Sequence, residues 1–358
     1  MKIAVLVSGG VDSSVSLALL KHAGHDVTAF YLKIWLEDEL SFLGECPWED
    51  DLQFVQKTCE FLDVPLEIVS LQQEYWDAVV SYTIAEAREG RTPNPDVLCN
   101  QFVKFDAFFR KISPEYEKVA TGHYAQTTTQ PDGTVDLLCS PDKVKDQTYF
   151  LSHLDQAQLK RALFPIGHLT KEEVRKLAIQ FNLPTAQRKD SYGICFLGKI
   201  SFDDFLKHHL NTKPGDLIEF ETGKKLGTHN GFWFHTIGQR KGLRLSGGPW
   251  YVVTKDPAKN IVYISNNYHA PEMTRKKFSV EHLHWINNPP THSALQVKLR
   301  HGPEKHSCQV IINKTTATIT LQENDQGIAP GQFAVFYNND ICLGCGVISL
   351  PDTPTFSS

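Results

Sequence analysis

A short stretch near the start of the chain, Ser8-Gly9-Gly10-Val11-Asp12-Ser13-Ser14, combines two glycines with three serines and one aspartate. It lies between an expected strand at 2–7 and a run whose apolar residues have helical spacing. Such a strand-turn-helix unit directs unpaired backbone N–H groups and the positive end of a helix dipole at one point. Glycine lets a phosphate approach the backbone closely, and the serine hydroxyls add hydrogen-bond donors. The stretch therefore predicts a phosphate-binding loop.

This loop differs from a Walker A motif, which ends in Gly-Lys-Ser or Gly-Lys-Thr. The chain has Asp12 where a cation would be expected, and we expect Asp12 to hold Mg²⁺ rather than to touch phosphate. A loop without lysine suits a pyrophosphate that leaves whole. The pattern resembles the PP-loop of the N-type ATP pyrophosphatases, which split ATP into AMP and pyrophosphate. The alternative is a glycine-rich turn that binds no ligand.

Two cysteines lie in loops rich in turn-forming residues. Cys99 follows Asn94-Pro95-Asp96, where the prolines of the segment restrict the backbone and Asp96 can lie near the thiol. Cys195 follows Gly193, which permits a sharp bend. Either cysteine alone is also compatible with a buried and unreactive thiol. Because both precede residue 205, in the part of the chain that carries the phosphate-binding loop, we interpret them as candidate reactive thiols.

The elements around these residues alternate between strands and helices. We expect strands at 26–32, 66–69 and 118–124, and helices at about 52–62 and 74–89. This alternation predicts an α/β fold with a doubly wound parallel sheet, whose ligands bind at the carboxyl ends of the strands. The loops at 91–100 and after 118–124 should therefore meet the glycine-rich loop.

The second half of the chain has a different pattern. Beyond 213–216 the helical periodicity fades, and short β-type runs separated by Gly, Pro and Asn replace it. We expect three domains: a PP-loop ATP pyrophosphatase catalytic domain at 1–205, a small β-rich central domain at 206–272 and a C-terminal β-barrel at 273–358. A chain of 358 residues with 41% hydrophobic content is long enough to build these cores.

Charge is distributed unevenly along the chain. The net charge is −5, but residues 1–205 contain 20 Lys and Arg against 30 Asp and Glu, whereas residues 206–358 contain 16 against 11. This favours an acidic catalytic body and a basic region for a polyanion, although ordinary variation in surface charge explains the numbers equally well. Without a leader pattern or an apolar run of membrane length, and with eight scattered cysteines, we expect a cytoplasmic protein with reduced thiols.

Six motifs occur in the order found in the tRNA-specific 2-thiouridylases, the MnmA family, and together they span most of the chain. They are the segments 8–14, 94–100 with Lys104-Phe105, 121–124, 145–151, 193–196 and 237–243. The chain resembles this family on all six. The resemblance implies an enzyme that uses ATP and Mg²⁺ to adenylate O2 of the wobble uridine of tRNA with release of pyrophosphate. A cysteine persulfide then supplies sulfur, which gives 2-thiouridine and AMP.

The resemblance also implies individual site residues. The persulfide cysteine maps to Cys195, and the thiol that resolves the persulfide and can end in a disulfide with it maps to Cys99. Asp96 is a candidate general acid or base, or else caps its own backbone turn. Nucleotide contacts are implied for Leu6, Val7, Ser8, Gly9, Gly10, Val11, Asp12, Ser13, Ser14, Leu32 and Gly122. Target-base or other tRNA contacts are implied for Asn94, Pro95, Asp96, His123, Lys145, Asp146, Gln147, Arg300, His301 and Gln332.

Other clusters are assigned more cautiously from the residues themselves. Arg240-Lys241 and the segment 275–277 would neutralise phosphates, although the second cluster is equally compatible with a solvated turn. Cys342-Leu343-Gly344-Cys345 alternates like an edge strand and is interpreted as structural, because no second cysteine pair accompanies it. The histidine pairs at 208–209 and at 282 and 284 are assigned no metal.

The expected partners are tRNA and a sulfur-donor protein, with no membrane, and the protein is expected to be a monomer. Two other functions fit parts of the pattern. A PP-loop ligase that forms amides or transfers nitrogen would need no cysteine pair. A non-catalytic tRNA-binding protein could keep the nucleotide fold without using it.

Overall fold

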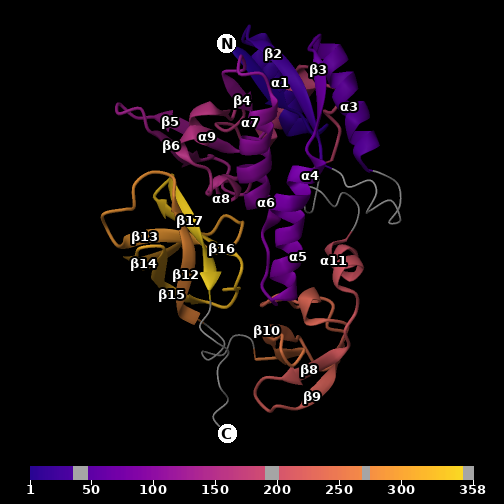
Figure 1. Ribbon diagram of the computed structural model, residues 1–358, viewed down its shortest axis with the longest axis vertical. Coiled ribbons are helices and arrows are strands. Elements are labelled where there is room, and N and C mark those ends of the chain that lie inside the picture. The colour runs from indigo at the N-terminus through magenta and orange to yellow at the C-terminus, as the bar shows by residue number, and fades with distance from the viewer. Residues whose placement is uncertain (35–46, 190–200, 268–274, 350–358) are drawn as a thin grey trace.

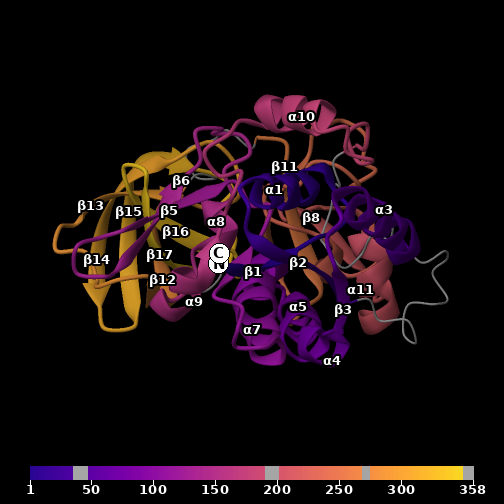
Figure 2. The same ribbon diagram turned by 90° about the horizontal axis from the view of Figure 1, so that it is seen from above.

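The first part of the computed structural model is a parallel sheet with helices on both faces (Figures 1 and 2). The structure describes residues 1–34, 47–189, 201–267 and 275–349. The five strands lie in the order β3-β2-β1-β4-β7, all parallel. Their bounds are β1 Lys2–Leu6, β2 Asp26–Lys33, β3 Leu66–Ser70, β4 Lys118–Ala120 and β7 Ala162–Leu163. The predicted α/β class and doubly wound sheet are confirmed.

The central strand β1 is buried on both faces. Ile3 and Val5 pack with helices on one side, and Ala4 and Leu6 pack with helices on the other, because successive strand residues point to opposite faces. The first side holds α1 (Val11–His22), α3 (Pro47–Leu62) and α10 (Lys171–Gln180). The second holds α4 (Gln72–Tyr75), α5 (Ser81–Arg88) and α7 (Phe108–Lys111). The carboxyl end of β1, where the phosphate-binding loop begins, therefore lies between two helical layers.

Two expected elements differ in detail. The helix expected at about 74–89 runs through α4, a π-helical segment Trp76–Val80 and α5. The segment 95–111 is built in the same way, from α6 (Pro95–Leu98), a π-helix Cys99–Ala107 and α7. The strand expected at 118–124 ends at Ala120, because the chain beyond it turns across the start of α1.

The remainder of the chain forms two β-rich units. The helix α11 (Phe202–Leu210) leads to a four-stranded sheet in the order β10-β11-β8-β9, and the last six strands form an antiparallel barrel closed by pairing of β12 with β17. The smaller sheet contains β8 Gly215–Glu219, β9 Lys225–His229, β10 Tyr251–Asp256 and β11 Ile261–Ser265. The barrel contains β12 Arg275–Trp285, β13 Ala294–Lys298, β14 His306–Asn313, β15 Thr316–Asp325, β16 Phe333–Asn338 and β17 Ile341–Ser349. The predicted small β-rich middle unit and C-terminal barrel are confirmed, while the domain boundaries at 205/206 and 272/273 stay predictions.

A hairpin from the first half of the chain extends the barrel sheet. Strands β5 (Ala125–Thr129) and β6 (Val135–Cys139) pair with each other, and β6 pairs with β17. The strand β17 also pairs with β12 and β16, so the edge-strand interpretation of residues 342–345 is wrong. Cys342 and Cys345 are buried, and burial raises the pKa of the Cys345 thiol to about 12. Within the described residues no helix is both long and apolar enough to cross a membrane.

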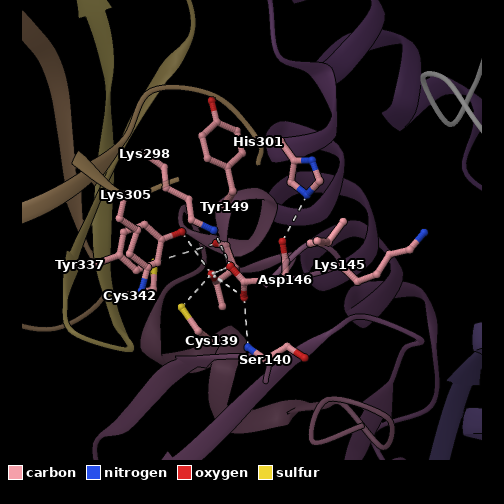
Figure 3. Close-up of polar contacts among 12 residues, drawn as sticks. Cys139, Ser140, Lys145, Asp146, Tyr149, Lys298, His301, Lys305, Tyr337 and Cys342 are labelled. Carbon is pink, nitrogen blue, oxygen red and sulfur yellow. Dashed lines mark hydrogen bonds and ion pairs between the residues drawn. The ribbon is translucent and has the colours of Figure 1, made fainter. Parts of the chain in front are cut away.

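A buried ion pair fastens the barrel to the segment after this hairpin (Figure 3). The Nζ atom of Lys298 on β13 lies 2.7 Å from Oδ2 of Asp146, and each side chain is only 2% exposed. The Asp146 carboxylate also accepts hydrogen bonds from the backbone N–H of Ser140 at 3.1 Å and from the Thr148 hydroxyl at 2.9 Å. Because these contacts satisfy the buried charges, the segment 140–148 has a fixed position against the barrel.

We expect Lys298→Met to lower the free energy of unfolding by about 3–5 kcal/mol, because the Asp146 carboxylate would stay buried without its cation. The double variant Lys298→Met with Asp146→Asn should recover part of this loss, since it removes both charges. Urea denaturation, monitored by circular dichroism, measures the free energy of unfolding of the single and the double variant. As a control, Lys176→Met removes an exposed pair with Glu172 and should leave the midpoint unchanged. A double variant no more stable than Lys298→Met would contradict this account.

Candidate active site

The turn between β1 and α1 forms a compact loop at the carboxyl edge of the sheet. Gly9 adopts φ +75°, in the left-handed region that favours glycine, and Gly10 is the N-cap of α1. The hydroxyls of Ser13 and Ser14 donate to the Gly10 carbonyl at 3.1 and 2.9 Å. The Ser13 hydroxyl also accepts from the backbone N–H of Ser8 at 3.2 Å, while the Ser8 side chain is exposed. The Ser8 hydroxyl also lies 3.3 Å from the Ser13 hydroxyl. The loop thus places an exposed serine side chain beside a helix N-terminus, an arrangement suited to phosphate binding.

Two glycines allow other segments to approach this loop. A Cβ atom on Gly9 would lie 2.6 Å from the Asp51 carbonyl oxygen, and one on Gly122 would lie 2.7 Å from the Ser13 nitrogen. Both distances are shorter than any ordinary contact of a Cβ atom. Residues 121–124 can therefore lie directly against the first turn of α1, so the loop after β4 meets the loop at 8–14.

The Asp12 carboxylate has two partners that the sequence did not indicate. The Nζ atom of Lys171, the first residue of α10, lies 2.7 and 2.9 Å from its two oxygens, and the Tyr124 hydroxyl donates to Oδ1 at 2.8 Å. Lys171 is 159 residues from Asp12 in sequence. The only sequence signal nearby is the Thr170–Glu173 capping box, which marks the start of α10 without indicating its neighbour.

Arg188 is a second cation beside the loop. Its Nη1 donates to the Gly9 carbonyl at 2.7 Å, and its Nη2 contacts Asp51 on α3. The guanidinium lies over the ring of Phe54, 4.4 Å from the centroid. Sequence analysis missed Arg188 as well, because a single arginine beyond a helix has no distinctive spacing.

The loop before Cys99 forms the other half of the site and contacts the barrel. Gln332 donates from Nε2 to the carbonyls of Thr92 and Pro93, both at 3.1 Å, and accepts from the Asn94 amide at 3.4 Å. The Asn94 amide also lies 3.5 Å from the Tyr149 hydroxyl. Gln332 was expected to contact tRNA, and in this structure its side chain positions the 92–94 segment.

Cys99 and Asp96 lie at the start of the α6 and π-helical stretch. Cys99 is only 1% exposed, and Asp96 is half-buried. The ring of His301 stacks on Phe150 with centroids 4.6 Å apart, and its Nε2 lies 3.2 Å from the Asp146 carbonyl oxygen. Burial lowers the pKa of His301, whereas the nearby charge of Asp96 raises it. The stacking on Phe150 and the contact with Asp146 therefore bring the His301 ring to the segment at 146–150.

Several predicted contact residues have side chains in the interior. His123 is buried with its Nδ1 2.7 Å from the Thr121 hydroxyl, and burial lowers the pKa of His123 well below its usual value. The Asp146 carboxylate is buried against Lys298, as described above. The side chains of His123 and Asp146 thus lie in the interior of this structure, and the tRNA contacts expected for these residues stay predictions. Motif matching identifies a segment but does not distinguish a surface residue from the residue that supports it.

Tyr124 and Gln147 connect the two halves of the site. The Tyr124 backbone N–H donates to Oε1 of Gln147 at 3.0 Å, and the Gln147 N–H donates to the Tyr124 carbonyl at 2.9 Å. The Tyr124 hydroxyl reaches Asp12, and Asp146, next to Gln147, contacts His301 through its carbonyl. Hydrogen bonds therefore run from the loop at 8–14 through Tyr124 to Gln147, and Tyr149, two residues further on, lies against Asn94 of the loop at 92–99.

Of the remaining predicted site residues, some are exposed or half-buried and one lies outside the described residues. Lys145 is half-buried, and Arg300 is exposed and forms a two-pronged pair with Asp325 at 3.2 and 2.9 Å. Leu32 is half-buried at the end of β2. Cys195 falls within 190–200, outside the described residues, so its expected pairing with Cys99 stays a prediction. No two of the described cysteines form a disulfide with each other.

Family models match the chain in three consecutive segments. Residues 1–199 match a tRNA methyl transferase HUP domain, residues 203–266 a tRNA methyl transferase PRC-barrel domain, and residues 275–348 an aminomethyltransferase beta-barrel domain. The three segments follow the order of the α/β unit, the small sheet and the barrel.

Close relatives match over almost the whole chain. The tRNA-specific 2-thiouridylase MnmA of Parabacteroides distasonis is 47% identical, with 97% of this chain and 99% of the relative covered. The protein named MnmA 2 in Bacteroides fragilis is 46% identical, covering 97% of this chain and all of the relative. The MnmA of Porphyromonas gingivalis is 44% identical, covering 98% and 99%. With this level of identity across all three parts of the fold, the chain belongs to the tRNA-specific 2-thiouridylase (MnmA) family.

Proposed function

We propose that the protein is an ATP-dependent tRNA-uridine 2-sulfurtransferase, which replaces O2 of the wobble uridine by sulfur. The observation that carries this proposal is the junction of two loops in one site. The loop at 8–14 has the features of a phosphate-binding turn. The loop at 92–99 carries Asn94 against the barrel residue Gln332, the half-buried Asp96 and Cys99, whose side chain is buried in the α/β core. Tyr124 bonds to Asp12 and to Gln147, and Tyr149, two residues after Gln147, lies 3.5 Å from the Asn94 amide.

The first step would be adenylation of the base. ATP fits the loop because Gly9 and Gly10 keep side chains away from the N-terminus of α1. Asp12 supplies a carboxylate for Mg²⁺, which commonly takes one or two carboxylates together with phosphate oxygens. Uracil O2 attacks the α-phosphorus, and the bond to the bridging oxygen breaks with release of pyrophosphate. Leu32 and the ends of β1 and β4 would surround the adenosine.

The second step would be sulfur transfer. The outer sulfur of a Cys195 persulfide attacks C2 of the base, and AMP leaves with the original O2. The Cys99 thiolate then attacks the inner sulfur, which forms a Cys99–Cys195 disulfide and releases 2-thiouridine. A thiol reductant returns both cysteines to the thiol state, and a sulfur-donor protein restores the persulfide. Asp96 would exchange a proton with the base or with the thiol of Cys99.

Basic side chains on the barrel and the middle unit would position the tRNA. Arg300 on the barrel is exposed, as are Arg240 and Lys241 in the loop before β10. Such residues contact phosphates, which fix the position of the RNA without reading its sequence. We further propose that the enzyme acts in the cytoplasm as a monomer.

The family-model descriptions name methyl transfer, and the relatives are named thiouridylases. We favour thiolation because a methyl transfer from a sulfonium donor forms no adenylated base and releases no pyrophosphate, so it would make no use of the loop at 8–14. Mass analysis of nucleosides from treated tRNA separates the two outcomes, since replacement of oxygen by sulfur and addition of a methyl group change the mass differently. A methylated product without 2-thiouridine would refute the proposal.

Cys195→Ser and Cys99→Ser should each abolish 2-thiouridine formation, because one removes the persulfide carrier and the other removes the thiol that releases the product. Nucleoside analysis of tRNA incubated with protein, ATP, Mg²⁺ and a persulfide donor measures this. Cys139→Ser, at a half-buried thiol outside the site, is the matched control and should keep activity. Thiolation at the normal rate in the Cys195→Ser variant would refute the assigned role.

Pyrophosphate release should depend on tRNA and should survive replacement of both Cys99 and Cys195, because adenylation precedes any sulfur chemistry. Asp12→Ala should lose this release while the variant still accepts sulfur on Cys195. A coupled pyrophosphate assay and gel analysis of the persulfide follow the two activities separately. Release without tRNA would favour an amide-forming or nitrogen-transferring ligase, and no release under any condition would favour a binding protein.

A further inference from the structure

The phosphate-binding loop has no cation of its own. Residues 8–14 contain no lysine or arginine, and their one charged side chain is the carboxylate of Asp12. A nucleotide triphosphate carries several negative charges, and the charge-assisted hydrogen bonds that bind phosphate most strongly come from Lys and Arg. The cations for this site must therefore come from another part of the chain.

Lys171 approaches the loop from the start of α10. Its ammonium contacts both oxygens of Asp12, and its side chain is 14% exposed against 32% for Asp12. The capping box formed by Thr170 and Glu173 fixes the first turn of α10, so the position of Lys171 at that turn is well defined. The positive end of the α10 dipole is itself compensated by Asp142, whose Oδ2 accepts from the Lys171 backbone N–H at 3.0 Å, so the side chain of Lys171 is the part of this turn that reaches the loop.

Arg188 contacts the loop at Gly9. Its guanidinium is fixed by the Gly9 carbonyl, by Asp51 and by the Phe54 ring. Its backbone carbonyl accepts a hydrogen bond from Nη1 of Arg175 at 3.1 Å, which ties this segment to α10. The planar guanidinium therefore borders the loop with a donor geometry that matches a phosphate.

We propose that Lys171 and Arg188 bind the β- and γ-phosphates of ATP and then the departing pyrophosphate. Before the nucleotide arrives, Asp12 and the Gly9 carbonyl keep these two side chains at the loop. When MgATP binds, Asp12 exchanges the Lys171 ammonium for Mg²⁺, and Lys171 exchanges the carboxylate for phosphate oxygens. The charged side chains of Asp12, Lys171 and Arg188 would each replace one partner by another, so none would be left buried and unpaired. This inference rests on the proposed use of ATP.

Calorimetric binding of pyrophosphate in EDTA and of MgATP, both without tRNA, tests the exchange. Lys171→Met should raise the Kd of both ligands about tenfold or more, because it removes a charge-assisted contact. Asp12→Asn should change the affinities for the two ligands in opposite directions. It should tighten pyrophosphate binding in EDTA, since the carboxylate no longer competes for Lys171, and it should weaken MgATP binding, since a Mg²⁺ ligand is lost. If the Asp12–Lys171 ion pair were purely structural, Asp12→Asn would not tighten the binding of one ligand and weaken the binding of the other.

Arg188→Ala should also raise the Kd for both ligands about tenfold or more. Arg188→Lys should restore only part of the lost affinity, because an ammonium lacks the planar set of donors of a guanidinium. Lys176→Met is the matched control, since Lys176 lies on the same helix and contacts Glu172 on the exposed surface. It should leave both Kd values unchanged. Circular dichroism of each variant confirms that the protein is folded before binding is measured.

The outcomes separate this inference from the proposed function. If the unaltered protein binds MgATP and both Lys171→Met and Arg188→Ala bind as tightly, the inference is wrong while the proposed function stands. If the binding pattern is as expected but tRNA is not thiolated, the phosphate site stands and the proposed function is wrong. If the unaltered protein binds neither ligand, both are wrong.

Discussion

The absence of a side chain at residue 122 is the constraint on which the site depends. A methyl group there would lie 2.7 Å from the Ser13 nitrogen, so only glycine lets the segment after β4 cross the start of α1. This crossing brings the Tyr124 hydroxyl to Asp12 and the Tyr124 backbone to Gln147. Without it, the phosphate-binding loop and the segment at 145–151 would have no shared residue. The family resemblance suggested adenosine contact for Gly122, and the packing gives a separate reason for glycine at this position.

The barrel is joined to the α/β unit by internal contacts as well as by chain connectivity. The β5–β6 hairpin continues its sheet, Lys298 pairs with Asp146 in the interior, and Gln332 holds the carbonyls of Thr92 and Pro93. These contacts set the barrel loop at 300–301 relative to the loop at 92–99. Under the proposed function, recognition of tRNA by the barrel and presentation of its base to the site therefore depend on one rigid arrangement.

The sequence predicted local features well and long-range partners poorly. Apolar runs gave β1, β2 and β3, and the glycine-serine pattern gave the turn before α1, because each depends on residues adjacent in the chain. Lys171 and Arg188 were missed because their contacts with Asp12 and Gly9 span 159 and 179 residues. The edge-strand error at Cys342 has the same origin, since alternation fixes which side of a strand is buried but not how many strands flank it.

Placing the phosphate-binding cations outside the loop has a chemical consequence under the proposed mechanism. A lysine within the loop would stay beside the phosphates throughout the reaction, whereas Lys171 and Arg188 each have an alternative oxygen partner within hydrogen-bond distance, on Asp12 and on Gly9. Release of pyrophosphate can then be accompanied by return of both cations to these partners, so product departure does not leave two uncompensated positive charges beside the adenylated base. Arg188 also precedes Cys195 by only seven residues. Under the proposed mechanism, a residue that binds pyrophosphate and the residue that carries sulfur thus belong to one short stretch of chain.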